Sequence, residues 1–553
     1  MRKRLFILLS LLLLALVSCS KVSEQTPCPE WCTLLVQAYG KGLQLENISY
    51  GIAVVQLNFE NNYGITISLQ QIRLDDCRSK DHAVVAYDSD YDWMVDGEST
   101  GVHRDATRSN SEALPVYAYF DSSGFRLYLS NGNCLFFSLP ESDPEPEPEP
   151  EPEPTPIQYD HPLPDGVTSL PLVYVNTVNG ASISSKTTYV DGVIKIMCTE
   201  DCHWDFPDLD SEIQIRGRGN STWGMEKKPY KIKLESKASV LGMPKDKEWC
   251  LIANYCDKSL LRNTVAMELS RIAGFSWTPR SVPVELYLNG SYKGVYDLFE
   301  HKKVSFDRVD IDVDAGDIYF ELESNKDEPV CWTTDHGAPV MFLDPQYPTQ
   351  TQQSEAKAWF KGFETTLWKG NFTNRTDHYS DYIDLPSFVN YFVVQELTKN
   401  VDGNLRKSTF ITWPKGGKLE MYHVWDFDIC LGNCDYYGDG LQTWEGWWIK
   451  DRGDWGYGHG WYYHLFQDPE FVSLVKERWD ELYPEFQKIP DFINERVEIL
   501  GEAPSRNFNK WRTLGYYVWP NAKVTGSYEG EVDWLLENYN KRLEWLDSHI
   551  RAL

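Results

Sequence analysis

The sequence predicts a multidomain protein, with an N-terminal all-β, sandwich-like module followed by an α+β domain of two lobes. A Pro-Glu repeat over residues 144–156 divides the chain into two regions of different character. The first region shows only short strand patterns, whereas the second begins with strands and ends with helices. Because 553 residues exceed what one hydrophobic core supports, at least two domains are expected. We expect a leader, a β-rich module, a linker and a C-terminal domain at residues 1–18, 19–142, 143–157 and 158–553.

The first residues have the pattern of a lipoprotein leader. Basic residues at positions 2–4 precede an apolar run, 5–17, that is too short to span a membrane comfortably. The run ends in Leu-Val-Ser-Cys, and such a cysteine, here Cys19, becomes the lipidated first residue of a mature chain. Several acyl chains, palmitate among them, give stable anchoring. We therefore expect an extracytoplasmic protein anchored to the cell envelope, at the outer membrane, the cell surface or the periplasmic face. A plain signal peptide and an uncleaved anchor are the alternatives.

The charge of the chain limits its partners. The formal net charge is -29, and loss of the basic leader makes it more negative. An acidic surface repels nucleic acid and anionic membranes, and no basic stretch of useful length offsets it. Nucleic acid is therefore excluded as a partner.

The N-terminal module is predicted from six short strand patterns separated by turn signals. The predicted strands lie at residues 52–59, 64–69, 84–87, 116–120, 125–129 and 134–139. Segment 93–101 is similar to parts of β-rich modules in Bacteroidetes-like surface lipoproteins of gut bacteria, which implies a spacer or binding module. The repeat that follows is expected to be a stiff, solvated polyproline II spacer.

A glycine-rich turn opens the most informative region of the C-terminal domain. A predicted strand, 213–216, leads into Gly-Arg-Gly-Asn-Ser-Thr-Trp-Gly, and a second strand, 229–234, alternates apolar and basic residues. Backbone N–H groups of such a turn and nearby lysines can bind phosphates. The candidates are Lys228, Lys231 and Lys233. The alternative is an ordinary turn with lysines on the solvated face of a strand.

Strands give way to helices along the rest of the chain. A strand at 249–255, a helix at 259–273 and a hairpin at 282–299 complete a small β-rich lobe. Beyond it, helices are expected around Trp359, after the caps Asp384 and Asp468, and over residues 532–550. A β lobe followed by an α lobe is the layout of kinase-like folds.

Two aspartates stand where phosphoryl transfer would need them. Asp402 lies in a tight polar loop, and Asp426 lies in a turn reached after two short strands, the first at 408–413. The first carboxylate can orient or deprotonate an attacking hydroxyl, while the second holds a divalent cation. A pair of ordinary turns capped by aspartates is the alternative.

Ordered motifs after the linker resemble the spore-coat protein H (CotH) kinase family. They include Arg-Gly-Arg-Gly-Asn-Ser-Thr-Trp at 216–223, Asn-Val-Asp at 400–402 and Trp-Asp-Phe-Asp at 425–428. Further matching segments lie at 170–177, 227–234, 261–263, 289–290 and 296–300. The resemblance implies a bilobal, atypical protein-kinase-like fold. It also implies phosphate transfer from ATP, with Mg²⁺ or Mn²⁺, to serine or threonine of secreted or coat proteins.

The resemblance assigns roles to individual residues. Asp402 resembles the catalytic aspartate and Asp426 the metal-binding aspartate, with Asp428 either a second ligand or a structural cap. One of the three lysines is expected to pair with the nucleotide phosphates. Glu300 is expected to pair with such a lysine or to line the nucleotide pocket, and a solvated strand end is its alternative.

The chain departs from the family at one position. Many members carry a metal-binding asparagine at the start of the strand after the catalytic loop, where this chain has Lys407, Ser408 and Thr409. Asn404 is the nearest substitute, two residues after Asp402. A catalytically silent surface adhesion or glycan-associated protein is therefore the second function hypothesis.

An aromatic segment offers a glycan site for that second hypothesis. Residues 444–448 and 455–463 are rich in tryptophan and tyrosine, which stack on sugar rings. The alternative is an aromatic patch of the core.

Overall fold

A computed structural model describes residues 161–435, 443–452 and 460–553, together with short strands between residues 52 and 138. The chain divides into two compact units, Met1–Pro156 and Ile157–Leu553. The leader, Cys19 and the Pro-Glu linker lie outside the described residues. Within the described part of the chain, no helix combines the length and apolar character that a membrane crossing requires.

The described parts of the first unit are strands, and each of the six predicted segments contains one. Two antiparallel pairs and two three-stranded sheets form, β1–β4, β2–β3, β5–β6–β7 and β8–β9–β10. The strands are β1 Ile52–Ala53, β2 Leu57–Glu60, β3 Thr66–Leu69, β4 Ile72–Arg73, β5 Val85–Tyr87, β6 Asp92–Val95, β7 Glu98–His103, β8 Pro115–Asp121, β9 Gly124–Leu129 and β10 Cys134–Ser138.

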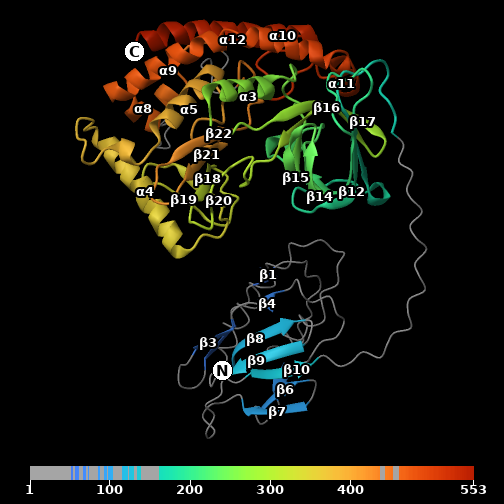
Figure 1. The fold of residues 1–553 in the computed structure, drawn as a ribbon, viewed down its shortest axis with the longest axis vertical. Helices are drawn as coiled ribbons and strands as arrows, with labels where there is room; N and C mark the ends of the chain where they lie inside the picture. The colour runs from blue at the N-terminus through green and yellow to red at the C-terminus, as the bar shows by residue number, and fades with distance from the viewer. Residues whose placement is uncertain are drawn as a thin grey trace. The chain divides into compact units, whose positions relative to one another are not determined.

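The second unit begins with a closed barrel in the order β11-β12-β13-β14-β15-β17-β16, drawn in green in Figure 1. All neighbours are antiparallel except β11 and β16, whose parallel pairing closes the barrel. Its strands are β11 Leu172–Thr177, β12 Val190–Met197, β13 Leu209–Gly217, β14 Tyr230–Val240, β15 Met243–Ile252, β16 Ser281–Leu288 and β17 Ser291–Glu300.

Alternating side chains explain the barrel. Over residues 213–217 of β13 and 230–234 of β14 every second residue is buried, and Ile213, Ile215 and Ile232 belong to the cluster that fills the interior. Asn289 and Gly290 join β16 to β17 with φ values of 50° and 71°, which suits a tight two-residue hairpin turn.

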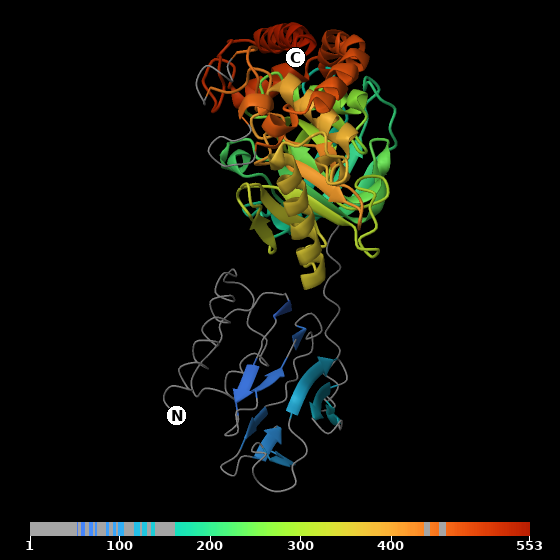
Figure 2. The ribbon, with the colours of Figure 1, turned by 90° about the vertical axis from the view of Figure 1, so that its left-hand side faces the viewer.

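A second sheet, in the order β19-β20-β18-β21-β22, follows the barrel. Its strands are β18 Ile318–Leu322, β19 Cys331–Thr333, β20 Pro339–Asp344, β21 Thr409–Trp413 and β22 Glu420–Val424. The sequence predicts only the last two, so β18, β19 and β20 are additional strands in a region where helices are expected to dominate. Helix α4, Gln350–Lys369, packs on this sheet through Phe360, which contacts Phe320 and Trp332, and stands in front of it in Figure 2.

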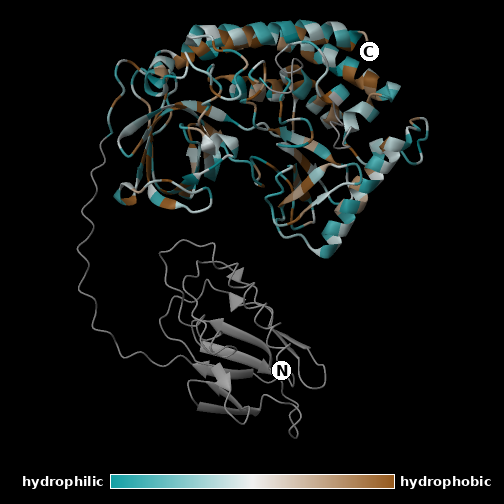
Figure 3. Cartoon of the chain, turned by 180° about the vertical axis from the view of Figure 1, so that it is seen from behind, coloured by the Kyte–Doolittle hydropathy of each residue, from teal (hydrophilic) through white to brown (hydrophobic). Residues whose placement is uncertain are grey.

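Most of the remaining helices come from the C-terminal part of the unit, and hydrophobic and hydrophilic residues alternate along them (Figure 3). They are α3 Arg262–Ala273, α5 Leu385–Thr398, α7 Ile449–Arg452, α8 Trp461–Leu465, α9 Pro469–Phe486, α10 Ile489–Leu500, α11 Ala503–Trp511 and α12 Tyr528–Arg551. Helix α5 is central, because α3, α9, α12 and β22 all pack against it. Asp384 and Asp468 cap α5 and α9, each accepting a backbone N–H at 2.9 Å, as predicted. The α+β composition of the unit is thus confirmed.

The aromatic segment, for which a glycan site and a patch of the core are the two alternatives, lies largely in the core. Trp448, Trp461 and Tyr462 are at most 1 % exposed, so their faces cannot stack on a sugar. Trp455 and Tyr457 lie outside the described residues.

Candidate active site

Two loops bring the predicted carboxylates together. Asp402 follows α5, and Asp426 and Asp428 follow β22. Two backbone hydrogen bonds tie the loops to each other. The N–H of Val401 donates to the carbonyl of Ile429 at 3.4 Å, and the N–H of Leu431 donates to that of Thr398 at 2.8 Å. The structure therefore places residues that are more than twenty positions apart side by side.

The three carboxylates repel one another. Burial, followed by repulsion from Asp426, raises the pKa of Asp402 to about 7 and that of Asp428 to about 8. Nearby Lys407 and Arg406 offset only part of this at Asp402. The site therefore has excess negative charge that a cation would relieve.

The residues present fit a divalent cation. The side-chain oxygen of Asn404 is buried without a hydrogen-bond partner, and such an orphaned oxygen is a natural metal ligand. Throughout residues 161–435, 443–452 and 460–553, no three His, Cys, Asp or Glu side chains form a ready metal cluster. Mg²⁺ usually takes only one or two carboxylates together with substrate phosphates, so the fit does not require such a cluster.

The glycine-rich turn lies across a small cavity from Asp426 and Asp428. Arg218 of this turn stacks over the ring of Trp425, 5.6 Å from its centre. Arg218 and Thr222 line this cavity together with Asp426 and Asp428. A Cβ at Gly217 would lie 2.3 Å from the Trp223 ring, so a larger residue there would have to displace that ring. A guanidinium facing two carboxylates across a cavity can bind a phosphate whose metal ion the carboxylates hold.

Comparison with known protein families shows which family the chain belongs to. The sequence model described as CotH kinase protein matches residues 215–546, which is more than half of the chain. The chain belongs to the CotH kinase family. A search of curated proteins finds no match.

The three predicted lysines of this CotH-family chain have different surroundings. Lys228 donates to the carbonyl of Trp223 at 2.7 Å and so holds the glycine-rich turn. Lys231 forms an ion pair of 2.8 Å with Glu248 and lies 2.9 Å from the Nε2 atom of His301. Lys233 lies on the same outer face of β14 and is partly exposed.

Sequence reasoning missed Lys227, which lines the small cavity. It is 1 % exposed, donates to Asn507 at 2.9 Å and lies 4.6 Å above the centre of the Tyr296 ring. Burial lowers its pKa to about 7, while the buried Asp297 opposes that shift. No periodicity marks this lysine, because it lies in the loop before β14.

Glu300 forms neither the predicted pair with a lysine nor a solvated strand end. Its carboxylate accepts hydrogen bonds from the backbone N–H and the Nε of Arg280, at 2.9 and 3.0 Å. Arg308 lies 3.8 Å from its second oxygen. Glu300 therefore pairs with arginines, and not with Lys228, Lys231 or Lys233 as predicted. A solvated strand end is also wrong, because Glu300 is fully buried.

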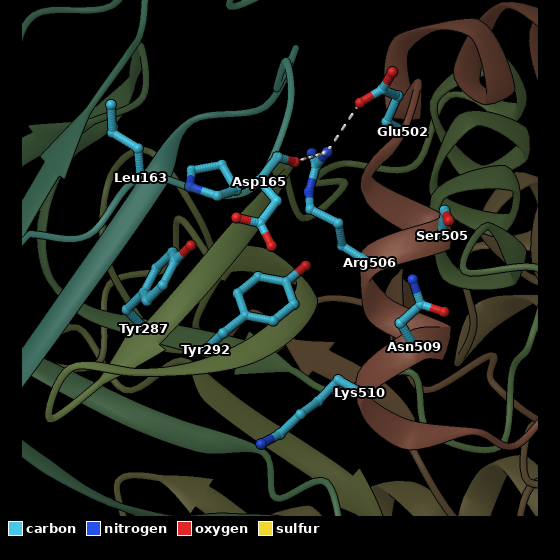
Figure 4. A pocket seen from close by; sticks show the side chains of 10 residues that line it. Leu163, Asp165, Tyr287, Tyr292, Glu502, Ser505, Arg506, Asn509 and Lys510 are labelled. Carbon is cyan, nitrogen blue, oxygen red and sulfur yellow. Dashed lines mark hydrogen bonds and ion pairs between the residues drawn. The ribbon is translucent and has the colours of Figure 1, made fainter.

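A separate, larger pocket of the CotH-family domain lies between the barrel and α11. Figure 4 shows Arg506 pointing between Glu502 and the backbone of Asp165, which it contacts at 3.4 and 3.3 Å. Arg506 also pairs with the buried Glu285 at 2.7 Å, and Tyr292 donates to Glu285 at 2.5 Å. This pocket shares no lining residue with the small cavity and contains none of the predicted site residues.

Proposed function

We propose that this chain is an ATP-dependent serine/threonine protein phosphotransferase with a bilobal, kinase-like domain. The observation that carries the proposal is the proximity of Asp402 to Asp426 and Asp428, the last two of which line a cavity together with Arg218 of the glycine-rich turn. In this proposal the barrel is the small lobe, and the second sheet with its helices is the large lobe. The substrate is a secreted or surface protein.

Each side chain has a role in this proposal. The carboxylate of Asp402 orients the acceptor hydroxyl and accepts its proton. Arg218 binds phosphate oxygens, while Lys228 and Lys231 support the turn and the strand around them. Asp426, with Asp428 and Asn404, would hold Mg²⁺ or Mn²⁺. When bound, the cation would offset the negative charge of the phosphate oxygens.

Metal removal is the first test. We expect the full-length chain to bind ATP in the presence of Mn²⁺ or Mg²⁺, and we expect chelation with EDTA to abolish binding. Asp426→Ala is expected to weaken metal-dependent binding at least tenfold, because it removes a direct ligand. Calorimetric titration with ATP, with and without the metal, measures both effects. A wild-type chain that binds no ATP in any metal would favour the catalytically silent adhesion or glycan-associated protein.

We also propose that the chain is exported and anchored to the cell envelope through Cys19. Cys19→Ser removes the thiol that lipidation requires. We expect this variant to leave the membrane fraction and to incorporate no labelled palmitate, while the wild-type chain stays in the membrane fraction and incorporates the label. An unchanged distribution in fractionated cells would rule out Cys19 as the anchor.

A further inference from the structure

The turn that carries Asp426 and Asp428 has an unusual backbone. Asp426 has φ of 68°, in the left-handed region that non-glycine residues rarely adopt. Its side chain is exposed, whereas the following Phe427 is fully buried. The conformation thus aims the carboxylate outward while the next side chain enters the core. Surrounding groups must hold such a turn.

Helix α3 supplies one of these groups at the start of the turn. The side-chain oxygen of Asn263 accepts the backbone N–H of Phe427 at 2.9 Å. This N–H belongs to the peptide bond directly after Asp426, so the contact fixes the peptide that defines the strained residue. Asn263 is only 5 % exposed.

Asn263 is itself fixed from the barrel. Its side-chain NH₂ donates to the side-chain oxygen of Asn254 at 3.2 Å. The NH₂ of Asn254 donates to Asp297 of β17 at 2.6 Å. This series of hydrogen bonds orients the Asn263 amide. Because its NH₂ group donates to Asn254, its oxygen faces Phe427.

The neighbouring residue of α3 holds the end of the turn. Arg262 donates through Nε to the carbonyl of Cys430 at 3.0 Å and through Nη2 to that of Leu431 at 3.3 Å. Its guanidinium is fixed by an ion pair of 2.6 Å with the buried Asp257. The first turn of α3 therefore holds the segment 427–431 at both ends.

We propose that Asn263 is a positioning residue that sets the direction of the Asp426 carboxylate and thereby the metal affinity of the site. The proposal rests on the proposed function for its metal ion, but its structural part stands on the bond to Phe427 alone. Asn263 contacts neither the metal nor the phosphates and acts through the peptide after Asp426.

Three variants of the full-length chain test this. Asn263→Ala removes the acceptor, and Asn263→Asp keeps an oxygen in its place. Asn390→Ala is the matched control, since Asn390 is another buried helical asparagine whose oxygen accepts a hydrogen bond, from Arg478 at 2.9 Å. Two quantities are measured, amide hydrogen exchange at Phe427 and the Mn²⁺ concentration that gives half-maximal ATP binding.

For Asn263→Ala we expect exchange at Phe427 to become at least tenfold faster and the Mn²⁺ requirement to rise by about tenfold. Asn263→Asp keeps the exchange slow and does not raise the requirement, and Asn390→Ala changes neither. Unchanged exchange in Asn263→Ala, or faster exchange in Asn263→Asp, overturns the proposal. An unchanged Mn²⁺ requirement in Asn263→Ala overturns it also, while leaving the proposed function intact. If the wild-type chain binds no ATP, the proposed function fails and the exchange data alone decide the role of Asn263.

Discussion

Replacing Arg542 by methionine is expected to lower the free energy of unfolding by about 3–5 kcal/mol. Arg542 of α12 and Glu396 of α5 are 2 % and 0 % exposed and form an ion pair of 2.8 Å. The variant leaves the Glu396 carboxylate buried without its cation, and an uncompensated buried charge is strongly destabilising.

The guanidinium of Arg542 also connects the aromatic segment to α5. It donates to the carbonyls of Trp444 and Gly446 at 2.8 and 2.7 Å, and Glu396 accepts the N–H of Ile449 at 2.9 Å. The substitution therefore breaks a network, and not a single pair.

Chemical denaturation monitored by tryptophan fluorescence measures the loss. Arg551→Met is the matched control on the same helix, because Arg551 pairs with Asp547 and Asp480 at the surface, where ion pairs contribute little. We expect the double variant Arg542→Met with Glu396→Leu to recover part of the stability, since it removes both charges. An Arg542→Met variant as stable as the wild-type chain would show that the ion pair with Glu396 does not stabilise the fold.

The second large effect is expected on catalysis. Asp402→Asn should lower the rate of phosphate transfer by about 10²–10⁴-fold. The amide has nearly the shape of the carboxylate but cannot accept the proton of the acceptor hydroxyl. ATP binding should stay close to that of the wild-type chain, because Asp402 is not assigned to the metal or the phosphates.

A time course of transfer from labelled ATP, run beside an ATP titration, separates the two quantities. Asp377→Asn is the control, because Asp377 is an exposed aspartate that pairs with Lys369. Transfer by Asp402→Asn at the wild-type rate would contradict the assignment of the catalytic base. A parallel loss of ATP binding would instead indicate that Asp402 takes part in nucleotide binding.

Local signals made part of the fold predictable. Asp384 and Asp468 were identified as caps because a cap bonds to N–H groups two or three residues away, within one stretch of sequence. The Asn289–Gly290 hairpin is local in the same way. In contrast, β18 is buried along its whole length, so it lacks the alternation that reveals a half-buried strand.

For the site, sequence alone determined which carboxylates to consider, because Asp402 and Asp426 stand in recognisable motifs. Only the tertiary structure decided what surrounds them. The pairing of Glu300 with Arg280, the burial of Lys227 and the bond from Phe427 to Asn263 join residues that are distant in the chain. Such contacts depend on how the barrel, α3 and the second sheet pack, and no pattern within a single segment encodes them.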